Sequence, residues 1–97
     1  MFKDSLPSEL TIMGIEIGIE KKPIRNAKGE FSDVHEVIRI NSDYSDDVAK
    51  RAFVHELIHS ILYLSGVHNH LDIKVEESIC DAIETGLTQH IRFHFED

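Results

Sequence analysis

The sequence predicts a small α+β protein in which an antiparallel sheet of about three strands is followed by two packed helices. Apolar and polar residues alternate in the first part of the chain, as they do in half-buried strands. From about residue 46 onwards the apolar residues recur at helical spacing instead. The 97 residues suffice for one hydrophobic core, so we expect a single domain over residues 1–97.

The predicted strands lie in the first 41 residues. Residues 9–20 form the first, and isoleucine at alternate positions in its second half gives it one apolar face. Gly14 interrupts this alternation and indicates a bulge or a short turn. After a polar segment, residues 31–34 are expected to form a short edge strand and residues 35–41 a longer strand.

The first predicted helix runs from about Asp46 to Ser65. Ser45 is its expected N-cap, and Gly66 is its expected C-terminal stop. A second helix is expected over about residues 73–93. Its core face is predicted from apolar and small residues at helical spacing, namely Val75, Ile79, Cys80, Ala82, Ile83, Leu87 and Ile91.

The first helix carries two histidines, His55 and His59, four positions apart. Residues at this spacing share a helical face, so both imidazoles can reach one metal ion. Glu56 projects beside that ion, where it can take a proton from water. This is the H-E-x-x-H arrangement of zinc hydrolases. We therefore expect His55 and His59 to bind Zn²⁺ and Glu56 to be the catalytic base; the other interpretation is a core helix whose histidines are satisfied by hydrogen bonds.

The second helix offers Glu76, Glu77 and Asp81 as third ligand. At 100° per residue, Glu76 falls near the centre of the apolar face, and Glu77 falls at its edge together with Asp81. The helical wheel alone leaves Glu76 and Glu77 both open. A metal site that admits a substrate lies at the edge of a core, which favours Glu77, with Asp81 supporting a histidine.

The remaining histidines are expected outside the site. His68 follows the motif by nine residues, which does not match the spacing of about six in zinc enzymes with a third histidine ligand. We expect His68 and His70 to be exposed in a loop. His90 and His94 are expected to face solvent near the end of the second helix.

Composition excludes several classes of protein. The net charge of −8 argues against a nucleic-acid partner, because phosphate recognition needs a basic face. No apolar run approaches the ~20 residues of a membrane span, and residues 1–7 lack the apolar core of a signal peptide. The single cysteine, Cys80, excludes an internal disulfide and is predicted to be a core residue and not a nucleophile. We expect a cytoplasmic protein without a membrane partner.

The motif helix also carries a family resemblance. Residues 53–62, followed after a loop by residues 77–83, resemble the small metallopeptidase-like proteins of phages and mobile elements that are related to the ImmA/IrrE group. The resemblance extends over about residues 10–93 and implies a zincin-like fold. The acidic pattern of that group's next helix falls on Glu77, Cys80, Asp81 and Ile83. The resemblance thus implies Glu77 as third ligand and a protein or peptide as substrate, with a repressor as one candidate.

Together these features predict a zinc-dependent metallopeptidase. Zinc lowers the pKa of water and polarises the scissile carbonyl, and Glu56 passes the proton of water to the leaving amine. Tyr44, Tyr63 and a loop histidine are the candidates for stabilising the oxyanion. One alternative is a zinc-binding regulatory or interaction protein of phage origin without turnover. Another is a metal-dependent hydrolase of a different substrate, including RNA, against which the acidic charge counts.

Overall fold

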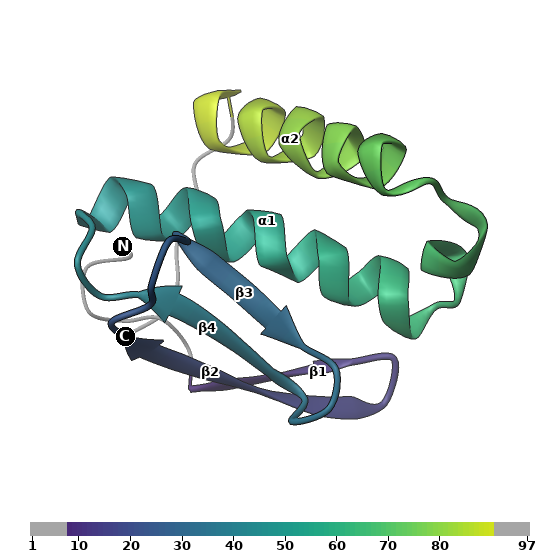
Figure 1. Ribbon diagram of the computed structural model, residues 1–97, viewed down its shortest axis with the longest axis horizontal. Coiled ribbons are helices and arrows are strands. Elements are labelled where there is room, and N and C mark those ends of the chain that lie inside the picture. Colours follow the sequence, from purple (N-terminus) through teal and green to yellow (C-terminus); the bar gives the residue numbers. More distant parts are fainter. Residues whose placement is uncertain (1–7, 91–97) are drawn as a thin grey trace.

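The computed structural model describes residues 8–90, with side chains as far as residue 87. The chain forms a small α+β domain with a four-stranded mixed sheet and two α-helices (Figure 1). In chain order the elements are β1 (Glu9–Ile12), β2 (Ile15–Lys22), β3 (Gly29–Ser32), β4 (Val37–Asn41), α1 (Asp46–Leu64), the 3₁₀ helix η1 (Val67–His70) and α2 (Ile73–His90). The helix α1 lies against the sheet, and α2 packs on α1 on the side away from the sheet (Figure 1).

The prediction of three antiparallel strands is wrong in number and in direction. The segment expected as one strand is a hairpin, because Met13 and Gly14 both have positive φ (52° and 81°) and turn the chain between β1 and β2. The sheet order is β1-β2-β4-β3. The strands β2 and β4 are parallel, whereas β1 pairs antiparallel with β2 and β3 pairs antiparallel with β4. This order leaves β3 at one edge of the sheet.

The main hydrophobic core lies between the sheet and α1. Ile17, Ile38 and Ile40 are completely buried on the face of the sheet that meets Phe53 of α1. The predicted alternation is confirmed here, since Ile17 is buried while its polar neighbour Glu16 is exposed. Burial of a large side chain such as Phe53 contributes roughly 1.5–3 kcal/mol. The core therefore fixes the orientation of α1 above the sheet.

The predicted limits of α1 are confirmed to within a residue. Ser45 is the N-cap, and its hydroxyl accepts a hydrogen bond from the backbone N–H of Val48 at 3.4 Å. Gly66 adopts a left-handed conformation with φ of 87° two residues after Leu64. The chain then enters η1, a short helix that the sequence analysis assigned to a loop.

The predicted core face of α2 is only partly correct. Cys80 is completely buried in a second cluster with Val54 and Ile58 of α1. Val75 and Ile83, however, are 49% and 41% exposed. The predicted position Ile91 lies outside the described residues. The face of α2 that meets α1 instead carries acidic side chains opposite the motif histidines. These acidic side chains and the histidines form the candidate site.

Neither described α-helix combines the length and hydropathy that a membrane crossing requires.

Candidate metal centre

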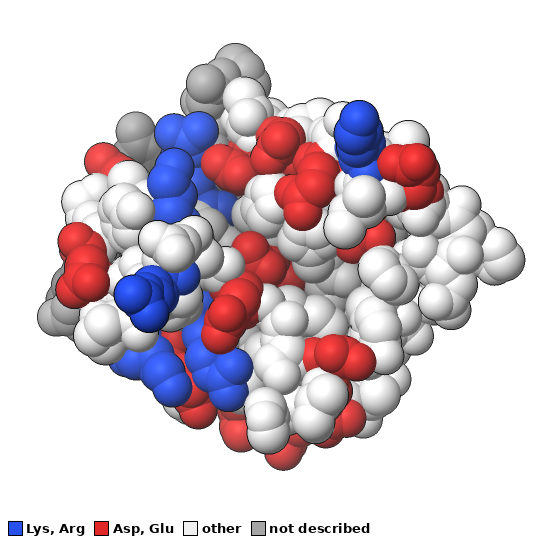
Figure 2. Space-filling model, viewed as in Figure 1, with Lys and Arg blue, Asp and Glu red and all other residues white. Residues whose placement is uncertain are grey.

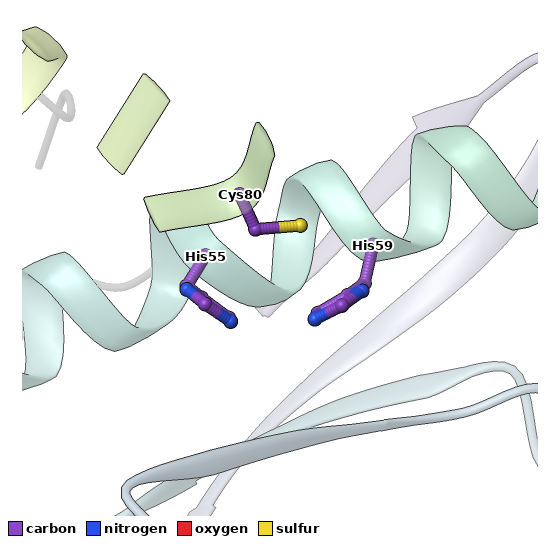
Figure 3. A group of neighbouring side chains, drawn as sticks. All are labelled: His55, His59 and Cys80. Carbon is purple, nitrogen blue, oxygen red and sulfur yellow. The ribbon is translucent and has the colours of Figure 1, made fainter. Parts of the chain in front are cut away.

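The two motif histidines lie on the same side of α1, within reach of Glu77 on α2. Their rings converge, and the ring centroids are 4.9 Å apart (Figure 3). The residues between them, Leu57 and Ile58, pack into the two hydrophobic clusters. Both imidazoles therefore sit at the edge of the core, half-buried, on a helix that the core holds in place.

The carboxylate of Glu77 lies between the two histidines. Its Oε1 is 3.1 Å from Nε2 of His55, and its Oε2 is 3.2 Å from Nε2 of His59. Glu77, predicted as third ligand from the resemblance, is thus the acid on α2 that faces the Nε2 atoms of both rings.

The opposite nitrogen of each ring is held by other carboxylates of α2. Nδ1 of His55 donates to Oε1 of Glu84 at 3.2 Å, with an oxygen of Asp81 at 3.3 Å. Nδ1 of His59 donates to Glu76 at 2.6 Å. A proton on Nδ1 leaves a lone pair on Nε2 in the neutral ring, which is the tautomer that binds a metal through Nε2. Glu76 was another candidate ligand on this helix. It accepts a hydrogen bond from His59 on the side of the ring that faces away from Glu77.

This donor set fits a zinc ion. An Nε2 lone pair opposite a carboxylate oxygen is stable only when positive charge lies between them, whether a proton on the ring or a metal ion. In a tetrahedral zinc site with bonds of 2.0–2.2 Å, neighbouring ligand atoms are about 3.3 Å apart. The nitrogen–oxygen distances of 3.1 and 3.2 Å are close to that value. Nitrogen and carboxylate ligands with their outer carboxylates are also the combination that zinc sites use.

Burial and neighbouring charges shift the pKa values of His55 and Glu56 in the motif. Burial acts to lower the pKa of His55, but the carboxylates of Glu56, Glu84 and Glu77 outweigh it and raise this pKa. Burial raises the pKa of the Glu56 carboxyl above its usual range, although both histidines oppose this. A carboxylate with a raised pKa is a better proton acceptor, as a general base requires.

Cys80, which was predicted only as a core residue, lies close to the motif histidines. Its side chain is completely buried, as predicted, and its sulfur lies beside the two imidazoles (Figure 3). Donor atoms of His55, His59 and Cys80 lie within 4.8 Å of one another, as do those of His55, Glu77 and Asp81. Burial, followed by the surrounding carboxylates, raises the pKa of the thiol to about 12, so it is protonated at neutral pH.

His68 was expected to be exposed in a loop, and it lies instead in a short helix with a hydrogen-bond partner. It lies in η1 with its side chain 43% exposed, and its Nδ1 donates to Glu76 at 2.6 Å. No local pattern signals this contact, because η1 reaches Glu76 only through the tertiary fold. His70 is exposed, as predicted. The side chain of His90 and all of His94 lie outside the described part of the chain.

Two cavities flank the motif and share Gly29, His55 and Glu56 in their walls. The first, of about 470 Å³, is bordered by Tyr44 and Arg51. The second, of about 570 Å³, is lined by Gly29, Glu30, Phe31, Asp33, His55, Glu56, His59, Tyr63, His68, Ile73, Glu76 and Glu77. Figure 2 shows acidic side chains over α2 and around the hollow beneath it. The motif therefore lies in the middle of a groove between α2 and the edge strand β3.

Two contributors to this groove were missed from the sequence. Gly29 lies just before the expected edge strand over residues 31–34, yet it opens β3 beside Glu56. Arg51 donates from Nε to Oε2 of Glu84 at 3.0 Å. It thereby completes a chain of hydrogen bonds that runs from solvent through Glu84 to His55. Its position four residues before His55, on the same helical face, is a signal that could have identified it.

Comparisons with known proteins give a similarity to solved structures but none to a family model or a curated protein. The structure is similar to that of the metallopeptidase zymogen jannalysin from Methanocaldococcus jannaschii, with a TM-score of 0.44 and 22% identity. The match covers 82% of this chain and 79% of that one. A similarity of this extent assigns no activity, so the chemistry of the site is derived from its own side chains.

Proposed function

We propose that the chain is a zinc-dependent metallopeptidase that hydrolyses a peptide bond with Glu56 as general base. The observation that carries this proposal is the Glu77 carboxylate, which faces Nε2 of both motif histidines. His55, His59 and Glu77 would hold the ion. When bound, zinc supplies a Lewis acid that polarises the carbonyl and acidifies water.

Acidic side chains of α2 orient the two histidines that would hold the ion. Glu84 and Asp81 orient His55, and Glu76 orients His59, each through Nδ1. Such outer partners keep the Nε2 atoms directed at the ion. The carboxylates of Glu76 and Glu84, which are largely buried, are stable as anions because the imidazoles, and the ion when bound, compensate their charge.

Glu56 is proposed to carry the proton. Water adds its oxygen to the carbonyl carbon, and one of its protons passes to the Glu56 carboxylate. The carbon–nitrogen bond then breaks, and the same proton moves from Glu56 to the leaving amine. The products are a carboxylic acid and an amine, and Glu56 returns to its starting state. The raised pKa of Glu56 suits both halves of this transfer.

The edge strand β3 favours a peptide as substrate. Among the described residues β3 pairs only with β4, so its outer edge is available along the groove. An extended peptide can add to such an edge through backbone hydrogen bonds, which places its carbonyl groups beside Glu56. We propose an intracellular protein substrate, with a repressor as one candidate, in line with the resemblance to the ImmA/IrrE group and its phage relatives.

The test combines metal content with peptide cleavage. Purified protein loaded with zinc should contain one ion per chain by elemental analysis. Incubation with a peptide library derived from a bacterial proteome should give cleavage products, detected by mass spectrometry, that a chelator abolishes and added zinc restores. The Glu56→Gln variant is the matched control, because it keeps the zinc ligands. Zinc binding without any cleavage would contradict the peptidase and favour a zinc-binding regulatory protein.

A further inference from the structure

Glu76 is a buried carboxylate that joins two histidines from different elements. Only 4% of the residue is exposed. Its Oε2 accepts from Nδ1 of His59 on α1, and its Oε1 accepts from Nδ1 of His68 in η1, both at 2.6 Å. Burial acts to raise the pKa of Glu76, but these hydrogen bonds outweigh it and lower the pKa. The Glu76 carboxylate therefore holds both His59, a candidate zinc ligand, and His68, the only half-buried histidine of η1.

This contact determines which atom of His68 remains for a ligand. Nδ1 is engaged by Glu76, so Nε2 is the nitrogen left, and no hydrogen bond to another described residue occupies it. His68 lines the same cavity as Glu56, His59 and Glu77. Its ring lies 5.5 Å from that of Tyr63, which holds it from the α1 side.

The other candidates for contacting a carbonyl oxygen are less well placed. The hydroxyl of Tyr63 already donates to Asp33 at 2.9 Å. Tyr44 borders the other cavity and is 43% exposed. Of the described residues that line the cavity of His68, none is Lys or Arg. His68 is thus the side chain on this wall with an available nitrogen.

We propose that His68 is a catalytic residue that donates a hydrogen bond from Nε2 to the carbonyl oxygen of the substrate, and that Glu76 is the positioning residue for both His68 and His59. This inference rests on the proposed peptidase function. In its protonated form His68 donates from Nδ1 to Glu76 and from Nε2 to the oxygen on which negative charge develops. It gives up no proton, so the proton balance at Glu56 is unchanged.

The kinetic test compares His68→Gln with His70→Gln, an exposed neighbour in η1 that lies outside the cavity. Loss of a donor to a developing oxyanion lowers kcat by about 10²–10³-fold. We expect His68→Gln to show this loss with KM and zinc affinity unchanged, and His70→Gln to behave as wild type. Glu76→Gln should lower kcat similarly and also weaken zinc binding by about 10–100-fold through His59. Equal kcat values for the two histidine variants would overturn the proposal.

A binding measurement separates this inference from the proposed function. Phenylphosphonate is a tetrahedral anion that resembles the charge of the hydrolytic transition state. Its dissociation constant for the zinc-loaded protein, measured by calorimetry, should rise at least 10-fold in His68→Gln and remain unchanged in His70→Gln. If wild type cleaves no peptide but this difference is found, the peptidase proposal fails while His68 stands as an oxyanion-binding residue. If both variants bind phenylphosphonate like wild type, His68 has no such role, whatever the peptidase assay gives.

Discussion

A Cβ atom added to Gly29 would lie 3.2 Å from Cγ of Glu56. The first residue of the edge strand therefore touches the proposed general base directly. The same Cβ would also lie 3.2 Å from the carbonyl oxygen of Arg39 on β4. Because that second neighbour is backbone, it cannot rotate away. The space for Glu56 thus depends on the absence of a side chain at position 29.

We predict that Gly29→Ala impairs hydrolysis more than zinc binding. The new methyl group must push Glu56 or its other neighbour aside by a few tenths of an ångström, and because a misplacement of ~1 Å can cost about 10²-fold in rate, a smaller loss is expected here. Overpacking of this kind also costs about 1–3 kcal/mol of stability. The measurements are kcat, zinc affinity and the free energy of unfolding. Gly18→Ala is the control, since its Cβ would meet Val37 at an ordinary 3.6 Å. Similar kcat values for both variants would show that Gly29 does not position Glu56.

The second prediction concerns the third zinc ligand. Glu77→Ala should weaken zinc binding at least as much as His59→Ala, because Glu77 faces Nε2 of both histidines. Asp81→Ala should give a smaller loss of about 10–100-fold, since Asp81 lies beside Nδ1 of His55 and not beside Nε2. A zinc competition titration measures both.

The control for this pair is Glu16→Ala, which removes an exposed acid from β2 and leaves the site intact. It should bind zinc like wild type and so excludes a general effect of lost negative charge. If Asp81→Ala strips the metal while Glu77→Ala keeps it, Asp81 is the ligand and Glu77 supports it.

The third prediction separates the base from the ligands. Glu56→Gln should keep one zinc per chain and lose hydrolysis by about 10²–10⁴-fold, because the amide cannot accept a proton from water. Glu56→Asp should recover part of the rate, since it restores a carboxylate at a shorter reach. Loss of zinc in Glu56→Gln would mean that Glu56 is needed to build the site.

The parts of the fold that depend on local periodicity could be predicted from the sequence. The helix α1 and the alternating face of β2 follow from side-chain spacing alone. The hairpin at Met13 and Gly14 could be predicted only in part, because Gly14 indicated a bulge or a short turn whereas methionine is no turn signal. The parallel pairing of β2 with β4 joins distant segments and leaves no local pattern.

The orientation of α2 shows why the candidate site was only partly predictable. Its apolar residues suggested a core face that included Val75 and Ile83, but these are exposed. The buried positions include Glu76, which is stabilised by His59 and His68 across the interface. The helical wheel places Glu76 on the inward face, where it is buried, but a wheel evaluates one helix at a time and cannot show which imidazoles on other elements meet this carboxylate. The contact between His68 and Glu76 could not be predicted for the same reason, because it joins two separate elements.

The last prediction concerns Cys80, whose sulfur lies beside the two motif histidines (Figure 3). We expect Cys80→Ala to keep one zinc per chain and cobalt-loaded wild type to lack sulfur-to-cobalt absorption. The physical reason is that Glu77 already directs a carboxylate at Nε2 of both histidines, whereas burial and the surrounding carboxylates raise the pKa of the Cys80 thiol. The raised pKa also predicts that folded protein reacts slowly with iodoacetamide at pH 8, whereas urea-unfolded protein reacts at the rate of an ordinary thiol. A sulfur-to-cobalt band that disappears in Cys80→Ala would instead make Cys80 a ligand and close the coordination position that hydrolysis requires.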